Sequence, residues 1–243
     1  TGACVASNFS FTGLDLSALN DSLPNIAFTV EQTDGAGNMG SGSASAAKDT
    51  VVPTVTIDAL VAINEDNQGS YSLTGTCSEN TRSVIVSVGG VSPAIAPACS
   101  GGTFSVTNLD VSAVVDNAAV VVTADHTDSF GNNATQASTT VLKDVLDPVV
   151  TITSNASITN ANKTSYTVEG TCDTDGLPVN ISVGGVSPGV QPTCVIAATP
   201  DFSVTFDVSG AADSTSLLIT AQMDDQAGNS SAIAQASVIK DTL

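Results

Sequence analysis

Acidic and amide side chains recur along this chain in the pattern Asp-x-x-Gly-Asn. The pattern spans residues 34–38, 128–132 and 225–229, and the whole chain holds only 5 Lys and Arg. Oxygen ligands gathered without basic residues suit a hard cation, and calcium tolerates irregular sites supplied by loops. The sequence therefore predicts calcium sites. The candidate ligands are Asp49, Glu79, Asp128 and Asn132 for one site, and Asp144, Asp173 or Asp175, Asp225 and Asn229, helped by Asp224, for the next.

The same pattern has a simpler interpretation. Asp and Asn side chains accept hydrogen bonds from backbone N–H groups a few residues on, which forms Asx turns in solvated loops. Two carboxylates about 5 Å apart repel each other by roughly 3 kcal/mol at an effective dielectric near 20. Acids that converge thus need a cation, whereas acids in separate Asx turns do not. Both interpretations stay open on the sequence alone.

Cysteine pairs recur with one spacing. Cys77 and Cys99 are 22 residues apart, as are Cys172 and Cys194, whereas Cys4 matches the second member of a pair whose first member is missing. Equivalent pairs predict two disulfides, with Cys4 unpaired within this chain. A zinc site is the alternative, but two cysteines per repeat without a nearby His make a poor zinc set. Disulfides form in oxidising compartments, so we expect an extracellular or cell-surface protein.

Enzymatic chemistry finds little support in the residues. The single His126 lies beside Asp125 at the end of a predicted strand, and its counterparts in the other repeats are Gln32 and Met223. We therefore expect a solvated or edge histidine and not a general base. A glycosidase needs a cleft lined by aromatic rings, but the chain has 2 Tyr and no Trp. We expect no enzyme activity and no catalytic residues.

Covalent Lys-Asn cross-links stabilise some surface sandwiches, and they need a buried lysine. Lys48, Lys143 and Lys240 recur where we expect linkers, not buried positions. The sequence therefore argues against such cross-links.

All of these residues belong to internal repeats. Lys-Asp recurs at 48–49, 143–144 and 240–241, and Gly-Thr-Cys recurs at 75–77 and 170–172. Self-similarity at a fixed period marks a tandem array of equivalent units. The predicted divisions are 1–48 as the C-terminal half of a repeat, 49–143 and 144–240 as complete repeats, and 241–243 as the start of the next linker.

Alternating β-branched residues predict the strands of a complete repeat. The expected strands of the middle repeat lie near 54–58, 70–77, 83–88, 91–98, 103–107, 118–125 and 135–142. Seven short strands are typical of an immunoglobulin-like sandwich. In that fold the N-terminal linker, the loop after the second strand and the loop before the last strand lie at one end, which would bring the candidate ligands together. We therefore predict an all-β fold, with tandem immunoglobulin-like sandwiches in an elongated array.

Composition and charge exclude several classes of function. The chain of 243 residues holds 24 Asp and Glu, so its formal net charge is −19. Nucleic-acid binders rely on clustered Lys and Arg, and anionic membranes attract basic segments, so neither partner is expected. With 42% hydrophobic and 12% charged residues, the chain is too apolar to be disordered. No apolar run approaches the roughly 18 to 20 residues of a membrane span, so we expect no membrane insertion.

The chain resembles tandem bacterial immunoglobulin-like repeats of large cell-surface adhesins and stalk proteins. The resemblance rests on Asp-x-x-x-Pro-x-Val-x-Ile at 49–57 and 144–152 and on the later Asp-x-x-Gly-Asn. It implies calcium between domains, held by Asp49 with Asp128 and by Asp144 with Asp225. The cysteine pairs depart from the pattern, because they are uncommon in adhesins exported in one step.

The expected function is structural: a segment of an extracellular stalk, adhesin or fibre, whose partners are neighbouring repeats of the same protein. One alternative is a self-assembling filament subunit, in which another copy completes residues 1–48. A further alternative is a carbohydrate- or protein-binding module, although the chain lacks an aromatic platform.

Overall fold

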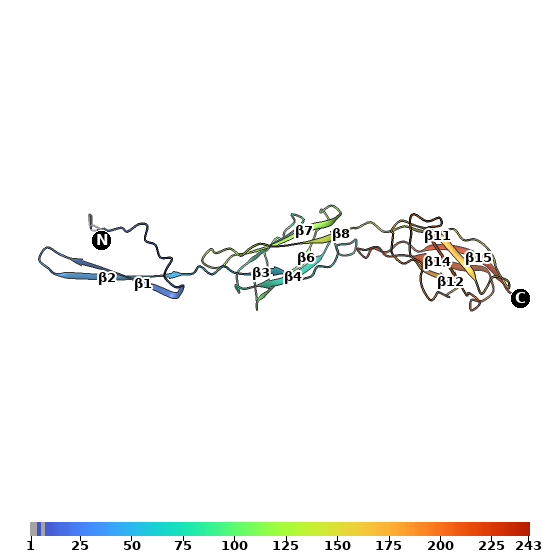
Figure 1. The fold of residues 1–243 in the computed structure, drawn as a ribbon, viewed down its shortest axis with the longest axis horizontal. Helices are drawn as coiled ribbons and strands as arrows, with labels where there is room; N and C mark the ends of the chain where they lie inside the picture. Colours follow the sequence, from blue (N-terminus) through green and yellow to red (C-terminus); the bar gives the residue numbers. More distant parts are fainter. Residues whose placement is uncertain (1–3, 6–7) are drawn as a thin grey trace.

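The protein is an elongated all-β molecule. A computed structural model describes residues 4–5 and 8–243, and no helix occurs among them. Three bodies follow one another along the long axis, from an N-terminal hairpin to a C-terminal sandwich (Figure 1). The fold class predicted from the strand pattern is confirmed.

The strands divide among the three bodies in chain order. The N-terminal body holds β1 (Ser22–Thr33) and β2 (Met39–Lys48). The middle body holds β3 (Val55–Ile57), β4 (Tyr71–Cys77), β5 (Val84–Val88), β6 (Thr103–Leu109), β7 (Asn117–His126) and β8 (Ala137–Lys143). The C-terminal body holds β9 (Val150–Ile152), β10 (Ile158–Thr159), β11 (Tyr166–Cys172), β12 (Asn180–Val183), β13 (Phe202–Phe206), β14 (Ser214–Gln222) and β15 (Ala234–Asp241).

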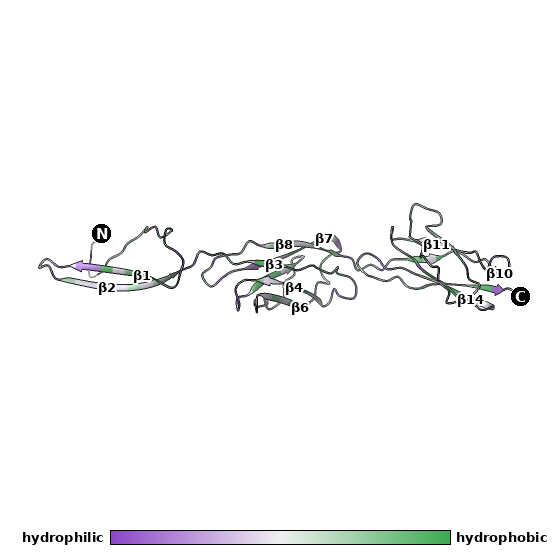
Figure 2. Ribbon diagram, turned by 60° about the horizontal axis from the view of Figure 1, so that its bottom comes forward, coloured by the Kyte–Doolittle hydropathy of each residue, from purple (hydrophilic) through white to green (hydrophobic). Residues whose placement is uncertain are grey.

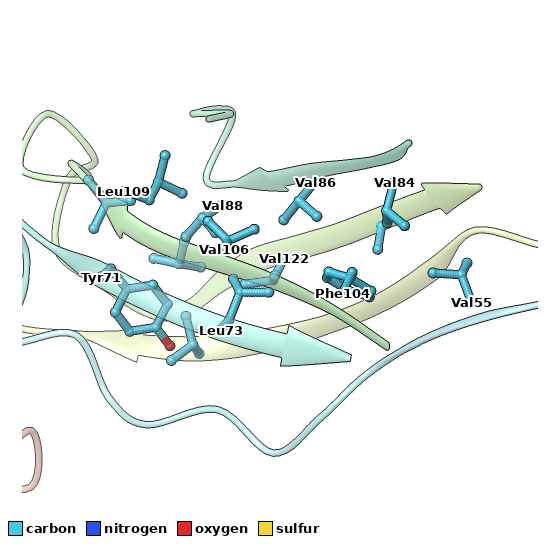
Figure 3. Close-up of a cluster of buried hydrophobic side chains, with 14 of the residues drawn as sticks. Val55, Tyr71, Leu73, Val84, Val86, Val88, Phe104, Val106, Leu109 and Val122 are labelled. Carbon is cyan, nitrogen blue, oxygen red and sulfur yellow. The ribbon is translucent and has the colours of Figure 1, made fainter. Parts of the chain in front are cut away.

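The middle body is a sandwich of two antiparallel sheets. One sheet has the order β3-β4-β6 and the other the order β5-β7-β8, which is an immunoglobulin-like arrangement. Every second residue of β4 and β5 is buried, because side chains alternate between the two faces of a strand. Figure 3 shows Leu73, Val86 and Phe104 pointing into the space between the sheets.

The C-terminal body repeats this arrangement, with its first strand divided between the sheets. β9 pairs antiparallel with β11, and β10 then pairs parallel with β15 in the other sheet. In the middle body the segment after β3 also crosses to the other sheet, where a single parallel bridge joins Ile63 to Lys143 in β8. Ile63 and Ile158 are both fully buried, so the crossing segment is part of each core.

The strand predicted at 91–98 is wrong. This segment contains Pro93 and Pro97, which cannot donate to a strand ladder. It lies along the free edge of β5 and covers only part of it: Val84 donates to the Pro97 carbonyl (N···O 2.8 Å) and Val88 donates to the Val91 carbonyl (2.8 Å). The segment protects an edge strand without forming a strand of its own.

Each of the two sandwiches contains one disulfide. Cys77 bonds Cys99 and Cys172 bonds Cys194, as the repeat spacing predicts, with Cα–Cα distances of 5.9 and 6.0 Å. The first disulfide joins the end of β4 to the segment that leads into β6. The second joins the end of β11 to the segment that leads into β13. Cys4 is an exposed free thiol in the described part of the chain.

The N-terminal body is a lone antiparallel hairpin. β1 pairs with β2, and no second sheet covers this hairpin within residues 4–5 and 8–243 (Figure 2). Phe28 and Val30 are only half-buried and line an open groove of about 690 Å³. An apolar sheet face is thus left in contact with water.

Each complete sandwich has its own hydrophobic core. The buried residues from Val55 to Val141 form one cluster and those from Val150 to Val238 form another, with no member in common. The boundaries at 48/49 and 143/144 stay predictions. No helix in the described ranges has the length and hydrophobicity needed to span a bilayer.

Candidate functional site

The first linker joins the hairpin to the middle sandwich, and an asparagine holds it. The Asn132 side-chain amide donates to the Asp49 carbonyl (Nδ2···O 3.2 Å) and to the Asp128 carboxylate (Nδ2···Oδ2 2.7 Å). Asp128 belongs to the loop between β7 and β8. The amide therefore ties the linker to the downstream sandwich.

The second linker has the same arrangement. The Asn229 amide donates to the Asp144 carbonyl (2.9 Å) and to Asp225 Oδ2 (2.7 Å), in the loop between β14 and β15. The two junctions are thus built from equivalent residues of successive repeats.

The carboxylates in these loops are also bound by their own backbone. Asp128 Oδ1 accepts from the N–H groups of Phe130 (2.8 Å) and Asn132 (2.9 Å), and Asp128 is 3% exposed. Burial, the largest single influence, raises the pKa of Asp128, but these hydrogen bonds and the one from the Asn132 side chain together hold it below the ordinary value. The Asx-turn interpretation of Asp-x-x-Gly-Asn accounts for this geometry.

The lowered pKa of Asp128 predicts that this loop contributes less stability in acid. Stability contributed by a carboxylate with a depressed pKa is complete above the unfolded value of about 4 and is lost as the pH falls through the folded value. We expect the contribution of Asp128 to be constant above about pH 5 and to disappear below about pH 4. Measured Tm against pH should fall less steeply in acid for Asp128→Asn than for the wild type. Asp147→Asn, at an exposed linker carboxylate, is the control and should follow the wild-type curve.

The upstream body holds each linker through an aspartate and a lysine. Lys143 Nζ lies 3.1 Å from Asp116 Oδ1, and Lys240 Nζ lies 3.0 Å from Asp213 Oδ1. Each pair is separated by 27 residues, as the pair of Asp21 with Lys48 also is. The same aspartates accept from the linker residue two positions after the lysine, and these contacts are Asp21 to Thr50, Asp116 to Val145 and Asp213 to Thr242.

The expectation that the repeating lysines are not buried is wrong for two of them, whereas the Lys48 side chain is 19% exposed. Lys143 and Lys240 are 2% and 3% exposed, because the loop before β7 or β14 covers the end of the last strand. Their partner is an aspartate carboxylate, so the contact is an ion pair. Sequence reasoning missed Asp21, Asp116 and Asp213, although their constant distance from the lysines was visible in the repeats.

The second junction also has direct contacts between sandwiches. Glu65, in the middle sandwich, donates its backbone N–H to Asn229 Oδ1 (2.9 Å), and Asn64 Nδ2 donates to the Ala227 carbonyl (3.1 Å). Sequence analysis did not single out Asn64 or Glu65, because their partners lie more than 160 residues away. Only the packing of one repeat on the next brings them together.

The side chains of the other predicted ligands bond elsewhere, including those of Asp49 and Asp144, which join the junctions only through their carbonyls. Glu79 lies near His126, whereas Asp173 accepts from the Val149 N–H (2.8 Å) and Asp175 accepts from the Ile196 N–H (3.1 Å). Asp49 and Asp144 each accept from the N–H two residues on, at Val51 and Leu146 (both 3.0 Å). Asp224 accepts from the Ser230 hydroxyl (2.6 Å).

The donor set as arranged does not fit calcium. In the described part of the chain no three acid, His or Cys side chains form a group that could hold a metal. Calcium takes 6–8 oxygen ligands in general, whereas the loop carboxylate and linker carbonyl at each junction face the N–H donors of an asparagine. An N–H group points a partial positive charge at the position that a cation would need.

His126 is buried, so the expectation of a solvated or edge histidine is wrong. The ring is 2% exposed at the end of β7. Its Nδ1–H donates to the Ser83 carbonyl (3.1 Å), and its Nε2 accepts from the Glu79 N–H (3.2 Å). Both ring nitrogens are thus occupied by backbone groups, and the side chain ties the end of β7 to the loop between β4 and β5 instead of serving as a base.

This role predicts the effect of replacing the ring. His126→Met fills a similar volume, as Met223 does at the equivalent position, but it removes the acceptor for Glu79 and the donor for Ser83. Leaving two backbone groups without these bonds should cost about 1 to 2 kcal/mol. Urea unfolding should give this loss with an unchanged m-value. Equal stability of variant and wild type would show that the bonds carry no net free energy.

Comparisons with known proteins give structural neighbours only. No family model matches the sequence, and no curated protein matches it either. Among solved structures, a match covers 89% of this chain and 57% of a Ca2+-stabilized adhesin that helps an Antarctic bacterium reach out and bind ice, at 22% identity and a TM-score of 0.44. The chain is similar to tandem repeats of bacterial adhesins.

Other structural neighbours are fibronectin(III)-like modules and a tandem repeat of a large adhesion protein. A match to the fibronectin(III)-like modules of Clostridium thermocellum CbhA has 16% identity and a TM-score of 0.48, and covers 78% of this chain and 95% of that one. A match to a tetra-tandem repeat in the extending region of a large adhesion protein has 23% identity and a TM-score of 0.37, and covers 95% and 60%. This chain therefore spans less than two thirds of the length of these two adhesin chains, 57% of the first and 60% of the second.

Proposed function

We propose that the chain is a structural tandem-repeat segment of an extracellular stalk, adhesin or fibre. The observation that supports this most directly is that each linker is held from both sides. At the first linker Asp21 accepts from the Thr50 N–H (3.0 Å), one residue away from the Asp49 carbonyl that Asn132 holds. Short linkers fixed at both ends keep successive sandwiches in line and transmit tension along the array. Two disulfides support an extracellular or cell-surface location.

The shape of the isolated chain in solution tests this function. We expect a monomer with a maximum dimension of about 100 Å, from two and a half sandwiches of roughly 40 Å each. Light scattering gives the mass, and small-angle X-ray scattering gives the dimension. A compact particle, with the sandwiches folded back on each other, would contradict a spacer function.

Calcium bracing of the junctions stays a proposal with its own test. To bind the ion, Asn132 and Asn229 would have to turn their amides away from Asp128 and Asp225. Binding would raise Tm when calcium is added, and excess EDTA would reverse the rise. A Tm that does not respond to either reagent rules the proposal out.

A second candidate function rests on the uncovered hairpin. The face of β1 that carries Phe28 and Val30 needs an apolar partner, because a lone two-stranded hairpin is marginal in water. In this alternative another copy supplies the covering sheet and the protein forms filaments. Such filaments should appear in electron micrographs of the chain and disappear when residues 1–48 are deleted.

A further inference from the structure

We propose that the Asn229 side chain couples the two complete repeats, doing with a neutral amide what the sequence assigns to calcium; this inference rests on the proposed structural function. Asn229 is 4% exposed, although it belongs to a loop at the end of a sandwich. Solvent is excluded from it because it lies between two sandwiches and the linker that joins them. A buried amide in such a place needs partners for all of its polar atoms.

Three separate parts of the chain supply those partners. The NH2 group donates to Asp225 in its own loop (2.7 Å) and to the carbonyl of Asp144 in the linker (2.9 Å). The oxygen accepts from the backbone N–H of Glu65 in the middle sandwich (2.9 Å). An amide carries two N–H donors and an acceptor oxygen, so one side chain meets all three needs.

The same chemistry explains why a cation is unnecessary. The Asp144 carbonyl and the Asp225 carboxylate are the linker and loop oxygens that a bridging ion would bind. Each already receives one hydrogen of the Asn229 NH2 group. A cation and this NH2 group compete for the same oxygens, so a junction held by the amide needs no calcium.

A neighbouring contact fixes the approach of the loop. Asn64 donates to the Ala227 carbonyl (3.1 Å), and a Cβ added at Gly228 would lie 3.3 Å from Asn64 Nδ2. Gly228 also has a φ of 91°, which favours glycine. The loop can therefore reach the middle sandwich closely enough for the bond between Glu65 and Asn229.

The first junction supplies a matched control within the same molecule. Asn132 donates to Asp128 and to the Asp49 carbonyl as Asn229 does at its own junction. Its oxygen receives no bond from those residues of the hairpin body whose side chains the structure describes. A variant at Asn132 thus loses the loop and linker bonds but no bond between complete repeats.

Hydrogen exchange in the full chain tests the coupling. In Asn229→Ala the Glu65 N–H loses its acceptor, so its protection measured by NMR should fall about tenfold or more. In Asn132→Ala the protection of Glu65 should stay at the wild-type value. Unchanged protection in Asn229→Ala, or an equal loss in both variants, would overturn the inference.

A second variant separates the effect of the N–H donors of Asn229 from the effect of the size of its side chain. Asn229→Asp keeps the shape of the side chain and an acceptor for Glu65. It replaces the NH2 group by an oxygen, which would face the Asp144 carbonyl oxygen and the Asp225 carboxylate without a hydrogen to share. Its Tm in EDTA should lie about 5 °C or more below that of the wild type. Equal Tm values in EDTA, or a wild-type Tm that rises with calcium, would overturn the inference. If these results are obtained and the wild-type particle is extended, the inference fails but the proposed function is retained. A compact particle would contradict the proposed function itself.

Discussion

Replacing Gly170 by alanine is expected to destabilise the C-terminal sandwich by about 3 kcal/mol or more. Gly170 lies inside β11, directly opposite Phe202 in β13. A Cβ at this position would come within 3.0 Å of the Thr151 carbonyl and of the Phe202 ring. The carbonyl belongs to the backbone of β9, so the strand itself would have to move, because no side-chain rotation relieves the contact.

The expected loss corresponds to a Tm decrease of about 12 to 24 °C for a sandwich of this size. Calorimetry measures it, and amide exchange in β11 assigns it to the C-terminal sandwich. Gly189→Ala is the matched control, since nothing lies within 4 Å of the added Cβ and the φ is not in the left-handed range. The control should change stability by less than about 0.5 kcal/mol. A small effect at Gly170 would mean that β9 can move away freely.

Removing the disulfide of the same sandwich is expected to cost about 3 kcal/mol. The bond closes a loop between residues 22 positions apart, and both cysteines are buried, at 7% and 0% exposure. Without it the unfolded chain gains freedom, and the segment between β12 and β13 loses its covalent attachment to β11. The double variant Cys172→Ala/Cys194→Ala should therefore unfold at a Tm about 12 to 24 °C lower.

Cys4→Ala is the control for the cysteine chemistry itself. Cys4 is exposed and unpaired within the described residues, so its replacement should leave Tm unchanged. Adding reductant to the wild type should lower Tm at least as far as the double variant does, because it opens the bond in both sandwiches. If reductant leaves the wild-type Tm unchanged, the two disulfides do not contribute to stability.

Several features could be predicted from the sequence because they depend on local pattern or on repetition. The alternation in β4 and β5 follows from the geometry of a strand, and the repeat of Cys77 and Cys99 at Cys172 and Cys194 fixes the disulfide pairs. The expectation that the segment at 91–98 forms a strand was wrong, because apolar content alone does not reveal that Pro93 and Pro97 block a ladder.

Burial of polar groups was the least predictable property of the candidate site. His126, Lys143 and Lys240 each lie at a strand end, where a sequence gives no sign of which loop covers them. The sequence left open whether the carboxylates of Asp128 and Asp225 bind a cation or form Asx turns, and in the structure they accept hydrogen bonds from amide donors. Loop conformation, at the scale of ångströms, decides which donor lies within hydrogen-bond distance of which acceptor.

By itself the sequence determined the all-β fold, the presence of tandem repeats and the disulfide pairs of this protein. These follow from side-chain alternation and from a repeat period, which are properties of residues close in sequence or equivalent by repetition. Only the tertiary structure decided how the junctions are held. The bond from Glu65 to Asn229 joins residues 164 positions apart in non-equivalent places of two repeats. No pattern within one repeat encodes it, because it exists only where one folded sandwich meets the next.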